Sequence, residues 1–324
     1  MKNHKMIPAS LRVAFVLLAS ALFAAGCAKK EAGQASFNSP EEAATAFVGA
    51  LQKDDTAALR NLLGPETDEL ISSGDPVADN AAREWFVSAY NAKHSLEADG
   101  ADSMTMLVGE DAWPMPIPIV KRNDKWYLDG AAGADEIVYR RVGRNELGAI
   151  DVCRGFVNAQ LDYAAQSHDG DPAGIYALKL ISDEGMQNGL YWPTTDEEPA
   201  SPAGPFVAAA AAEGYRSAEG GARTPYHGYY YRMLYAQGAN SNGGAKDYFK
   251  AGVMTEGFAL VAWPADYGSS GVQTFIVNQD GIVFQKDLGE DTAKAVESIQ
   301  SFDPDSSWIA IAPPTEEEAA PPAA

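Results

Sequence analysis

The sequence contains few cysteines and few basic residues. It has two cysteines, Cys27 and Cys153, and its 24 lysines and arginines are outnumbered by 45 acidic residues, which gives a net charge of -21. Besides Cys27, which directly follows the N-terminal leader described below, the chain has one thiol, that of Cys153. One thiol cannot form an internal disulfide, so stability must come from the hydrophobic core. An acidic chain repels phosphate, which argues against binding to nucleic acid and against broad contact with an anionic lipid surface.

Long apolar segments are also rare. The segment from Val13 to Ala25 is too short to span a bilayer as a mature helix, and basic residues precede it at Lys2, Lys5 and Arg12. This order is typical of a secretory signal peptide. The sequence after it contains no stretch long and apolar enough to cross a membrane, so we expect a periplasmic globular part.

The leader ends in LFAAGC, with small residues directly before Cys27, and resembles the lipobox at which bacterial lipoproteins are cleaved and lipidated. Ala24 stands where that family usually has Leu. The resemblance implies that Cys27 becomes the first mature residue and carries acyl chains, which anchor the protein to the membrane. Ala28 follows instead of Asp, which implies sorting to the periplasmic face of the outer membrane of a Gram-negative bacterium. The alternative is an ordinary signal peptide with an incidental cysteine.

The hydrophobic pattern predicts an α+β protein with two structured units. The expected ranges are 1–26 for the lipoprotein signal peptide, 27–35 for a tether, 36–133 for a first α+β domain, 134–312 for a long helix with an antiparallel sheet domain, and 313–324 for a disordered acidic and Pro-rich tail.

The first unit is predicted to place helices before strands. Ser39 followed by Glu42 predicts a capped helix start, a second short helix should stop at Gly64, and a third should begin near Asp79. Strands are predicted over the ranges 104–108, 117–121 and 125–128. This order resembles the cystatin-like and NTF2-like class, in which a curved sheet wraps a helix and can leave a pocket. In that class the pocket is catalytic in some members and packed shut in others.

The segment between the two units is predicted to form one long helix that ends near His168, with Gly143 as a candidate kink. Cys153 lies on its apolar face, which favours a buried and inert thiol over a nucleophile. At the helix end, His168, Asp169 and Asp171 resemble metal ligands, but in a turn rich in Gly and Pro they more simply mark a helix stop. We therefore predict no metal site.

Three arginines, Arg140, Arg141 and Arg144, cluster on this helix in a chain that has few cations. One interpretation is a docking point for an acidic group of a partner, because the guanidinium fork binds carboxylates and phosphates. The other is pairing along the helix surface, with Glu136 four residues before Arg140 and with Glu146 nearby. The second interpretation is the simpler one, because such surface pairs are common and weak.

The second unit is predicted to be a sheet. The range 189–221 is expected to be a loop-rich segment within this unit. Strands are expected over 229–236, 258–263, 272–277 and 282–286. A turn is expected at Asp280-Gly281, and a last helix is expected from Asp291 to Phe302. The GSSG segment lacks the glycine spacing of a nucleophile elbow, so serine hydrolase chemistry has no support.

Two resemblances concern the second unit and the whole chain. The motifs Ala262-Trp263-Pro264, Gly271 with Phe275, and Asp280-Gly281 make the range 146–289 similar to the globular part of type IV pilin-like proteins, although the apolar filament-building helix of pilins is absent. The segments YRRVGRNEL, GYYYRML and GFALVAWPADYGSSGVQTFIVNQDGIVFQKDLG resemble a bacterial envelope family catalogued as domain of unknown function 2950. This resemblance implies no activity and no catalytic residues.

The features together suggest a lipid-anchored, non-enzymatic binding or scaffolding component of the envelope, with an envelope protein as partner and no cofactor. One alternative is a small-ligand-binding module that uses the pocket of the first unit. Another is a hydrolase of envelope polymers with paired carboxylates, although Asp and Glu residues are plentiful and no pair stands out by its spacing.

Overall fold

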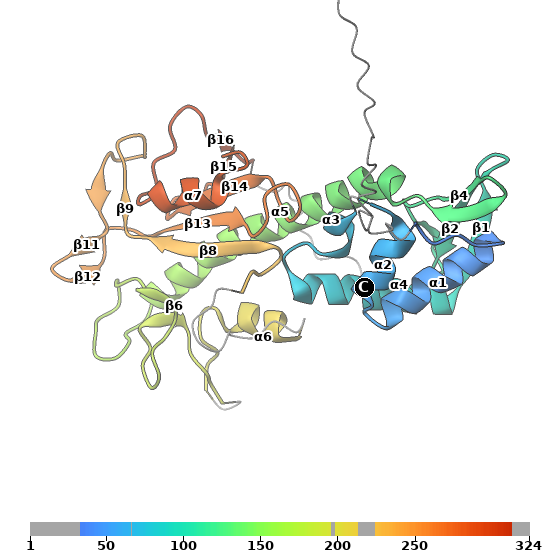
Figure 1. The fold of residues 1–324 in the computed structure, drawn as a ribbon. Coiled ribbons are helices and arrows are strands. Elements are labelled where there is room, and N and C mark those ends of the chain that lie inside the picture. The colour runs from blue at the N-terminus through green and yellow to red at the C-terminus, as the bar shows by residue number, and fades with distance from the viewer. Residues whose placement is uncertain (1–32, 66, 196–197, 213–223, 313–324) are drawn as a thin grey trace, which may run out of the picture. The chain divides into compact units, whose positions relative to one another are not determined.

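Helices and antiparallel sheets alternate along the chain in the computed structural model, so the α+β expectation is confirmed (Figure 1). The structure describes residues 33–65, 67–195, 198–212 and 224–312. From Gln34 onward, the described residues belong to one compact unit. The predicted signal peptide, Cys27 and the predicted tail at 313–324 lie outside the described residues. In the described ranges, no helix combines the length and the apolar character needed to cross a membrane.

The N-terminal region, residues 34–129, packs helices against one antiparallel sheet. Its elements are α1 (Pro40–Gln52), α2 (Thr56–Leu63), α3 (Asp68–Ile71), α4 (Pro76–Ala92), β1 (His94–Ala98), β2 (Ser103–Val108), β3 (Trp113–Pro114), β4 (Ile119–Arg122) and β5 (Lys125–Leu128). The strand order is β1-β2-β4-β5, and β3 pairs with β2. The strand predicted over 117–121 corresponds to β4, which begins two residues later, at Ile119. Helix α4 begins at Pro76, before the predicted start near Asp79, because Asp75 caps its first turn.

Ser39 caps helix α1, as the sequence predicts, and Glu42 reaches back to the N–H of Asn38, one residue before the N-cap. Ser39 Oγ accepts a hydrogen bond from the Glu42 N–H at 3.2 Å, and Glu42 Oε2 accepts one from the Asn38 N–H at 2.9 Å. Pro40 occupies the first turn, where no backbone N–H is needed. The buried face of α1 then packs into the N-terminal core, through Ala43, Ala44, Phe47, Val48 and Ala50.

Helix α5 (Gly130–Ala164) is 35 residues long and joins the two regions. At a rise of 1.5 Å per residue it spans roughly 50 Å. It runs without interruption through Gly143, begins before the predicted start at residue 134, and ends before His168. Its first turns pack on the N-terminal core through Ile137, and its later turns pack on the C-terminal core.

The C-terminal region, residues 165–312, is built around a second antiparallel sheet with the order β16-β15-β14-β13-β8. Its elements are β6 (Lys179–Ile181), β7 (Gly189–Tyr191), α6 (Gly204–Ala212), β8 (Tyr229–Leu234), β9 (Ala236–Gln237), β10 (Lys246–Asp247), β11 (Phe249–Lys250), β12 (Val253–Met254), β13 (Ala259–Pro264), β14 (Gln273–Asn278), β15 (Phe284–Asp287), α7 (Thr292–Ala295), the 3-10 helix η1 (Val296–Ser298) and β16 (Ile309–Ala310).

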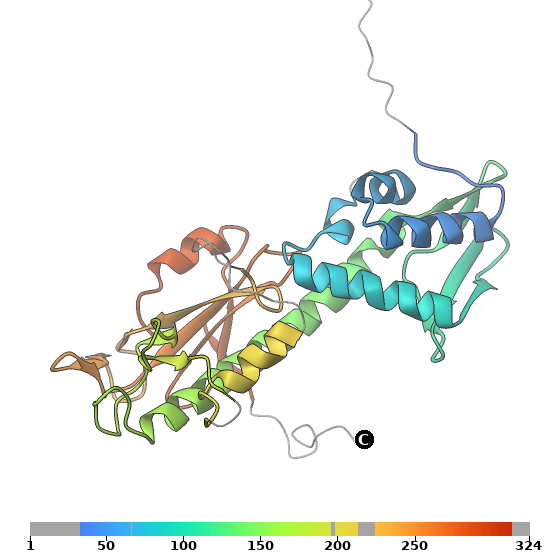
Figure 2. The same ribbon diagram turned by 90° about the horizontal axis from the view of Figure 1, so that it is seen from below.

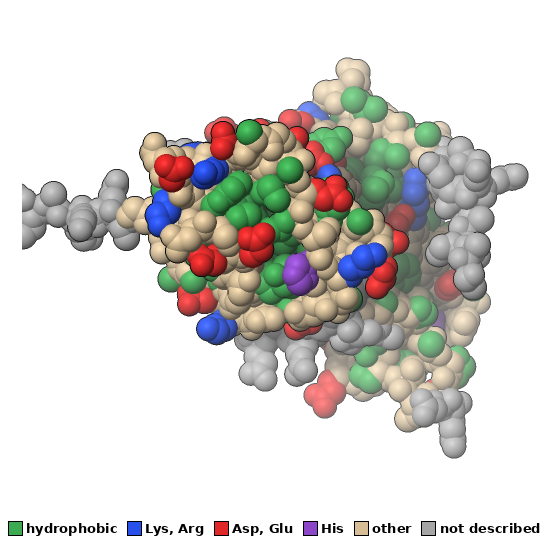
Figure 3. Space-filling view, turned by 90° about the vertical axis from the view of Figure 1, so that its right-hand side faces the viewer, with side chains coloured by type: hydrophobic (Ala, Val, Ile, Leu, Met, Phe, Trp, Pro, Cys, Tyr) green, Lys and Arg blue, Asp and Glu red, His purple; other side chains and the backbone are tan. Residues whose placement is uncertain are grey.

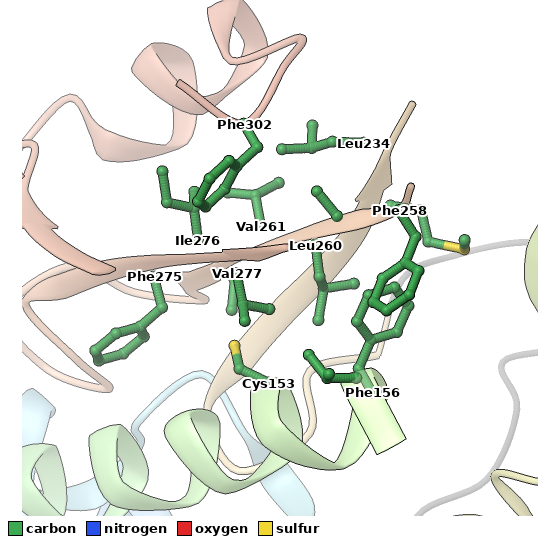
Figure 4. Close-up of a cluster of buried hydrophobic side chains, with 14 of the residues drawn as sticks. Cys153, Phe156, Leu234, Phe258, Leu260, Val261, Phe275, Ile276, Val277 and Phe302 are labelled. Atoms are coloured by element: carbon green, nitrogen blue, oxygen red, sulfur yellow. The ribbon is translucent and has the colours of Figure 1, made fainter. Parts of the chain in front are cut away.

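Both faces of this sheet are covered. Every residue of β13 is buried, and Figure 4 shows how its side chains alternate. Leu260 points toward Cys153 and Phe156 on α5, while Val261 points to the opposite side, toward Phe302 (Figure 4). A strand that is apolar on both faces therefore lies between a helix and the C-terminal segment, as in a three-layer arrangement.

Two sequence predictions in this region were wrong in their extent. The alanine run within the predicted loop-rich segment 189–221 is helical, and α6 lies beside α5 (Figure 2). A Cβ atom at Gly155 on α5 would meet the Phe206 ring of α6 at 2.1 Å. The predicted last helix is limited to α7 and η1, and it ends before Ile299. Ile299 and Phe302 still pack on the core, but from irregular backbone.

Figure 3 shows the face formed by the N-terminal sheet and its connecting loops. Hydrophobic side chains gather near the middle of this face, and acidic and basic side chains alternate around them. The face therefore presents charges of both signs, although the whole chain is acidic.

Candidate functional site: a cavity beside helix α5

A cavity of about 680 Å³ opens in the N-terminal region, between its helices and the first half of α5. This volume is within the usual range for pockets that bind small molecules, and the lining is mostly apolar. The apolar lining comes from α1, α2, α3, α4, β3, the β3–β4 connection and α5, through Phe47, Leu51, Leu59, Leu63, Leu70, Ile71, Val77, Ala78, Ala81, Ala82, Trp85, Phe86, Trp113, Met115, Pro116, Ile117 and Ile137.

Small and large side chains alternate along the cavity face of α4. Ala78 and Ala82 leave space over the first turns, whereas Trp85 and Phe86 form an aromatic wall one turn further on. The wall is closed by Trp113 of β3, whose ring is 5.4 Å from Trp85 and 6.3 Å from Phe86, both edge to face. Trp85 is 52% exposed, so this wall reaches the mouth of the cavity.

The polar side chains of the lining come from the α3–α4 connection, from α4, from α5 and, through His227, from the segment before β8. Among the described residues, four arginines line the cavity, and Asp79 is its one carboxylate. Asp79 is held in place by the Ser73 N–H at 2.9 Å and by the Ser73 hydroxyl at 2.8 Å. Arg83 is engaged as well, since it pairs with Asp54 at 2.9 Å and donates to the Ile71 carbonyl at 2.7 Å.

The structure brings the three predicted arginines to the cavity but gives them different partners. Arg140 follows the helix-pairing interpretation, because its Nε lies 2.6 Å from Glu136 Oε1. Its guanidinium also lies 5.4 Å from the centre of the Trp113 ring, at a distance where a cation and an aromatic face attract each other. The Arg140 guanidinium thus already has an ion-pair partner in Glu136 and an aromatic partner in Trp113.

Arg141 connects three segments. Its guanidinium donates to the carbonyls of Glu69 at 2.6 Å and Leu70 at 3.3 Å, and to the Ser269 hydroxyl at 3.3 Å. Burial lowers the pKa of this guanidinium below its ordinary value, and the positive charge of Arg144 also lowers it. An arginine remains charged at neutral pH even so, and this one fixes α3 and the β13–β14 loop to α5.

Arg144 completes the row on the same helix face and is exposed. In the described part of the chain it has no hydrogen bond and no ion pair. The expected partner Glu146 is used elsewhere, because its Oε1 accepts the N–H groups of Val272 at 2.9 Å and Gln273 at 3.0 Å. Pairing along the helix therefore does not account for Arg144.

The C-terminal region contributes to the same end of the cavity through His227. The Gly228 N–H donates to Asp75 Oδ2 at 2.9 Å, and the Asn145 side chain donates to the Ser270 carbonyl at 2.9 Å. Asp75 is fully buried and also caps α4 through Val77 and Ala78. These contacts fix one wall of the cavity to residues more than a hundred positions away.

The other candidate residues from the sequence do not form a site. His168 stacks on Tyr163, its Nε2 lies 3.0 Å from the Tyr163 carbonyl, and its Nδ1 lies 3.1 Å from Gln187 Oε1. Asp169 instead accepts the Gln187 N–H at 2.6 Å. Within the ranges that the structure describes, no three His, Cys, Asp or Glu side chains come together as metal ligands. In the GSSG segment, Ser270 is buried and its hydroxyl bonds the Asp266 backbone.

Sequence reasoning did not single out the residues that shape the cavity. Trp85 and Phe86 fall within the predicted third helix, but nothing in the sequence indicates that Trp113, more than twenty-five positions later, packs edge to face against both rings. The alternation of alanines with aromatic residues along α4 was a usable signal, because small residues on an otherwise apolar helix face leave space that a partner or ligand can fill.

The fold and cavity define an α+β protein with an apolar, arginine-rimmed pocket. The chain belongs to the family DUF2950, described as a protein of unknown function, whose model matches residues 34–311. No curated protein and no solved structure matches the chain. The family match thus covers both regions and α5, and it assigns no activity to any residue.

Proposed function

We propose that this protein is a non-enzymatic binding component of the bacterial envelope that holds a small, largely apolar molecule in the cavity beside α5. The observation that carries the proposal is the cavity of about 680 Å³ with its mostly apolar lining. An apolar ligand bound there would remove part of this apolar lining from water, which is favourable. The cystatin-like or NTF2-like character expected for this region agrees with a pocket between helices and a sheet.

Ala82 offers a way to test the cavity without disturbing the core, because it lines the cavity and its side chain is exposed. We expect Ala82→Phe to lower the affinity for a neutral apolar probe, N-phenylnaphthylamine, about tenfold by filling the mouth. The measurement is probe fluorescence in a titration of residues 34–324, which form one compact unit.

Ser88→Phe is the matched control for this variant. Ser88 is exposed on the same helix α4 and does not line the cavity, so this variant adds the same phenyl ring outside the cavity. Equal probe affinity in both variants, or no probe binding by the unsubstituted protein, would contradict the proposal. A ligand that binds the folded state must also raise its melting temperature, which gives a second readout.

We propose further that the protein is a lipoprotein anchored through Cys27 on the periplasmic face of the outer membrane. The lipobox-like LFAAGC segment supports this location. Cys27→Ser should abolish the incorporation of labelled palmitate and release the protein from the membrane fraction. Incorporation that continues in the variant would exclude this anchor.

A second candidate function is scaffolding by contact with an envelope protein. It is favoured by the exposed face of α5, where Tyr139 is 76% exposed and Leu147 is 66% exposed. Apolar side chains that are grouped on an exposed surface often mark a protein-interaction site. Photocrosslinking from position 139 in cells should capture one reproducible partner protein, and a lack of any crosslinked protein would remove this candidate.

A further inference from the structure

The charge of the cavity lining points to the chemical class of its ligand. Four of the lining residues are arginines and one is an aspartate, although acidic residues exceed basic ones almost twofold in the whole chain. Three of the four arginines are engaged: Arg83 with Asp54, Arg140 with Glu136, and Arg141 with backbone carbonyls. Arg144 is the remaining cation of the lining.

The position of Arg144 suits it to bind the end of a ligand. It is separated from Ile137 by seven residues, which is two turns of α5 and a distance of roughly 10 Å along the helix. Ile137 packs on the apolar core of the N-terminal region, whereas Arg144 lies beside Asn145 at the end that the C-terminal region closes. The same helix face thus runs from an apolar end to a cationic end.

We propose that the ligand is an amphipath with a single apolar chain and an anionic head group, and that Arg144 binds the head group while the apolar lining buries the chain. This inference rests on the proposed function of the cavity. A guanidinium binds carboxylates and phosphates alike, and its hydrogen bonds to such groups are stronger than those between neutral groups. Arg141 holds the neighbouring backbone in place and adds positive potential, but three of its five N–H donors are already used.

Three probes with the same alkyl chain separate the binding of the head group by Arg144 from the burial of the chain by the apolar lining. Decanoate and decyl phosphate carry anionic heads, and decanol carries a neutral one. Their dissociation constants would be measured by calorimetry below the micelle concentration, with the tryptophan fluorescence of Trp85 and Trp113 as a second signal, because both rings line the cavity. Residues 34–324 serve as the protein, so that no attached lipid competes.

We expect at least one anionic probe to bind about tenfold more tightly than decanol, as a charged hydrogen bond predicts. Arg144→Gln should remove this difference and leave the decanol affinity unchanged within about twofold. Arg144→Lys should keep part of the preference for anions, and added salt should weaken the binding of the anions only. The comparison of decanoate with decyl phosphate decides between a carboxylate and a phosphate head.

Arg154→Gln is the matched control, because Arg154 lies on α5 outside the cavity lining. It should leave all three affinities unchanged. If decanol binds as tightly as both anions, or if Arg144→Gln lowers the affinity for all three probes equally, the assignment of Arg144 is overturned while the cavity remains a binding site. If none of the three probes binds although N-phenylnaphthylamine does, the amphipathic ligand is overturned while the cavity remains a binding site; if N-phenylnaphthylamine does not bind either, the proposed function itself fails.

Discussion

At the scale of single residues, Cys153 places an ionisable thiol in the hydrophobic core. Its thiol is fully buried between α5 and the C-terminal sheet (Figure 4), and burial raises its pKa from 9.0 to about 12, with the nearby charge of Arg154 opposing the shift. The unfolded chain releases this proton above pH 9, and the folded chain keeps it until about pH 12. The resulting stabilisation is therefore complete below pH 9 and is lost as the pH rises between these values.

We expect the free energy of unfolding to fall between pH 9 and pH 12, with Cys153 alone contributing about 1.4 kcal/mol per pH unit. Urea unfolding at several pH values would measure it. Cys153→Ala should unfold at lower urea but show a shallower decline, because the alanine cannot ionise. Equal slopes for the two proteins would contradict the assignment.

The arginine cluster shows what could be predicted at this scale. Pairing of Arg140 with Glu136 follows from a spacing of four residues, and the structure has it. The partners of Arg141 are carbonyls and a hydroxyl, which no charge pattern reveals, and one of them is 128 residues away. Glu146 was expected to pair with the arginines, but its carboxylate accepts the backbone N–H groups of Val272 and Gln273. Such backbone partners are likewise invisible in a pattern of charges.

At the scale of elements, helix α5 contains two glycines that should respond to substitution with opposite signs. Gly143 has helical backbone, and a Cβ atom there would meet nothing within 4 Å, so Gly143→Ala should stabilise the protein by about 0.5–1 kcal/mol. At Gly133 a Cβ atom would lie 2.8 Å from the backbone N of Ile117. Gly133→Ala should therefore destabilise by about 1–3 kcal/mol.

Thermal or urea unfolding of both variants measures the two effects, and each variant controls for the other because the residue change and the helix are the same. A loss of stability in Gly143→Ala would indicate that this position needs the flexibility of glycine. That result would favour the kink predicted from the sequence over the continuous helix in the structure.

Element boundaries were predictable where local hydrogen bonds set them. The N-cap at Ser39, the stop of α2 at Gly64 and the turn before β5 each depend on residues within a few positions. The alanine-rich α6 was missed because its support comes from packing, and Phe206 meets α5 at Gly155. The long last helix was wrong because Ile299 and Phe302 reach the core from irregular backbone.

At the scale of the whole molecule, the two hydrophobic clusters are separate sets of residues that share α5. Buried polar contacts connect them near one point, where Gly228 donates to Asp75 and Asn145 donates to Ser270. Buried hydrogen bonds of this kind cost free energy when one partner is lost, so they should force the two regions to unfold together. The sequence predicted two structured units and a rigid helix between them, but it contained no signal for this connection, whose partners lie 125 and 153 residues apart.

Gly228→Ala should break the connection. Gly228 has φ of +72°, and a Cβ atom would lie 2.4 Å from Asn145 Nδ2. We expect hydrogen exchange to show equal opening free energies for β2 and β14 in the unsubstituted protein, and values that differ by at least about 1 kcal/mol in this variant. Gly281→Ala is the control, because its φ of +74° is equally strained but a Cβ atom there meets nothing within 4 Å. It should lower both opening free energies by the same amount. If β2 and β14 still open together in Gly228→Ala, the coupling lies in the continuous helix α5 and not in the buried contacts around Asp75 and Asn145.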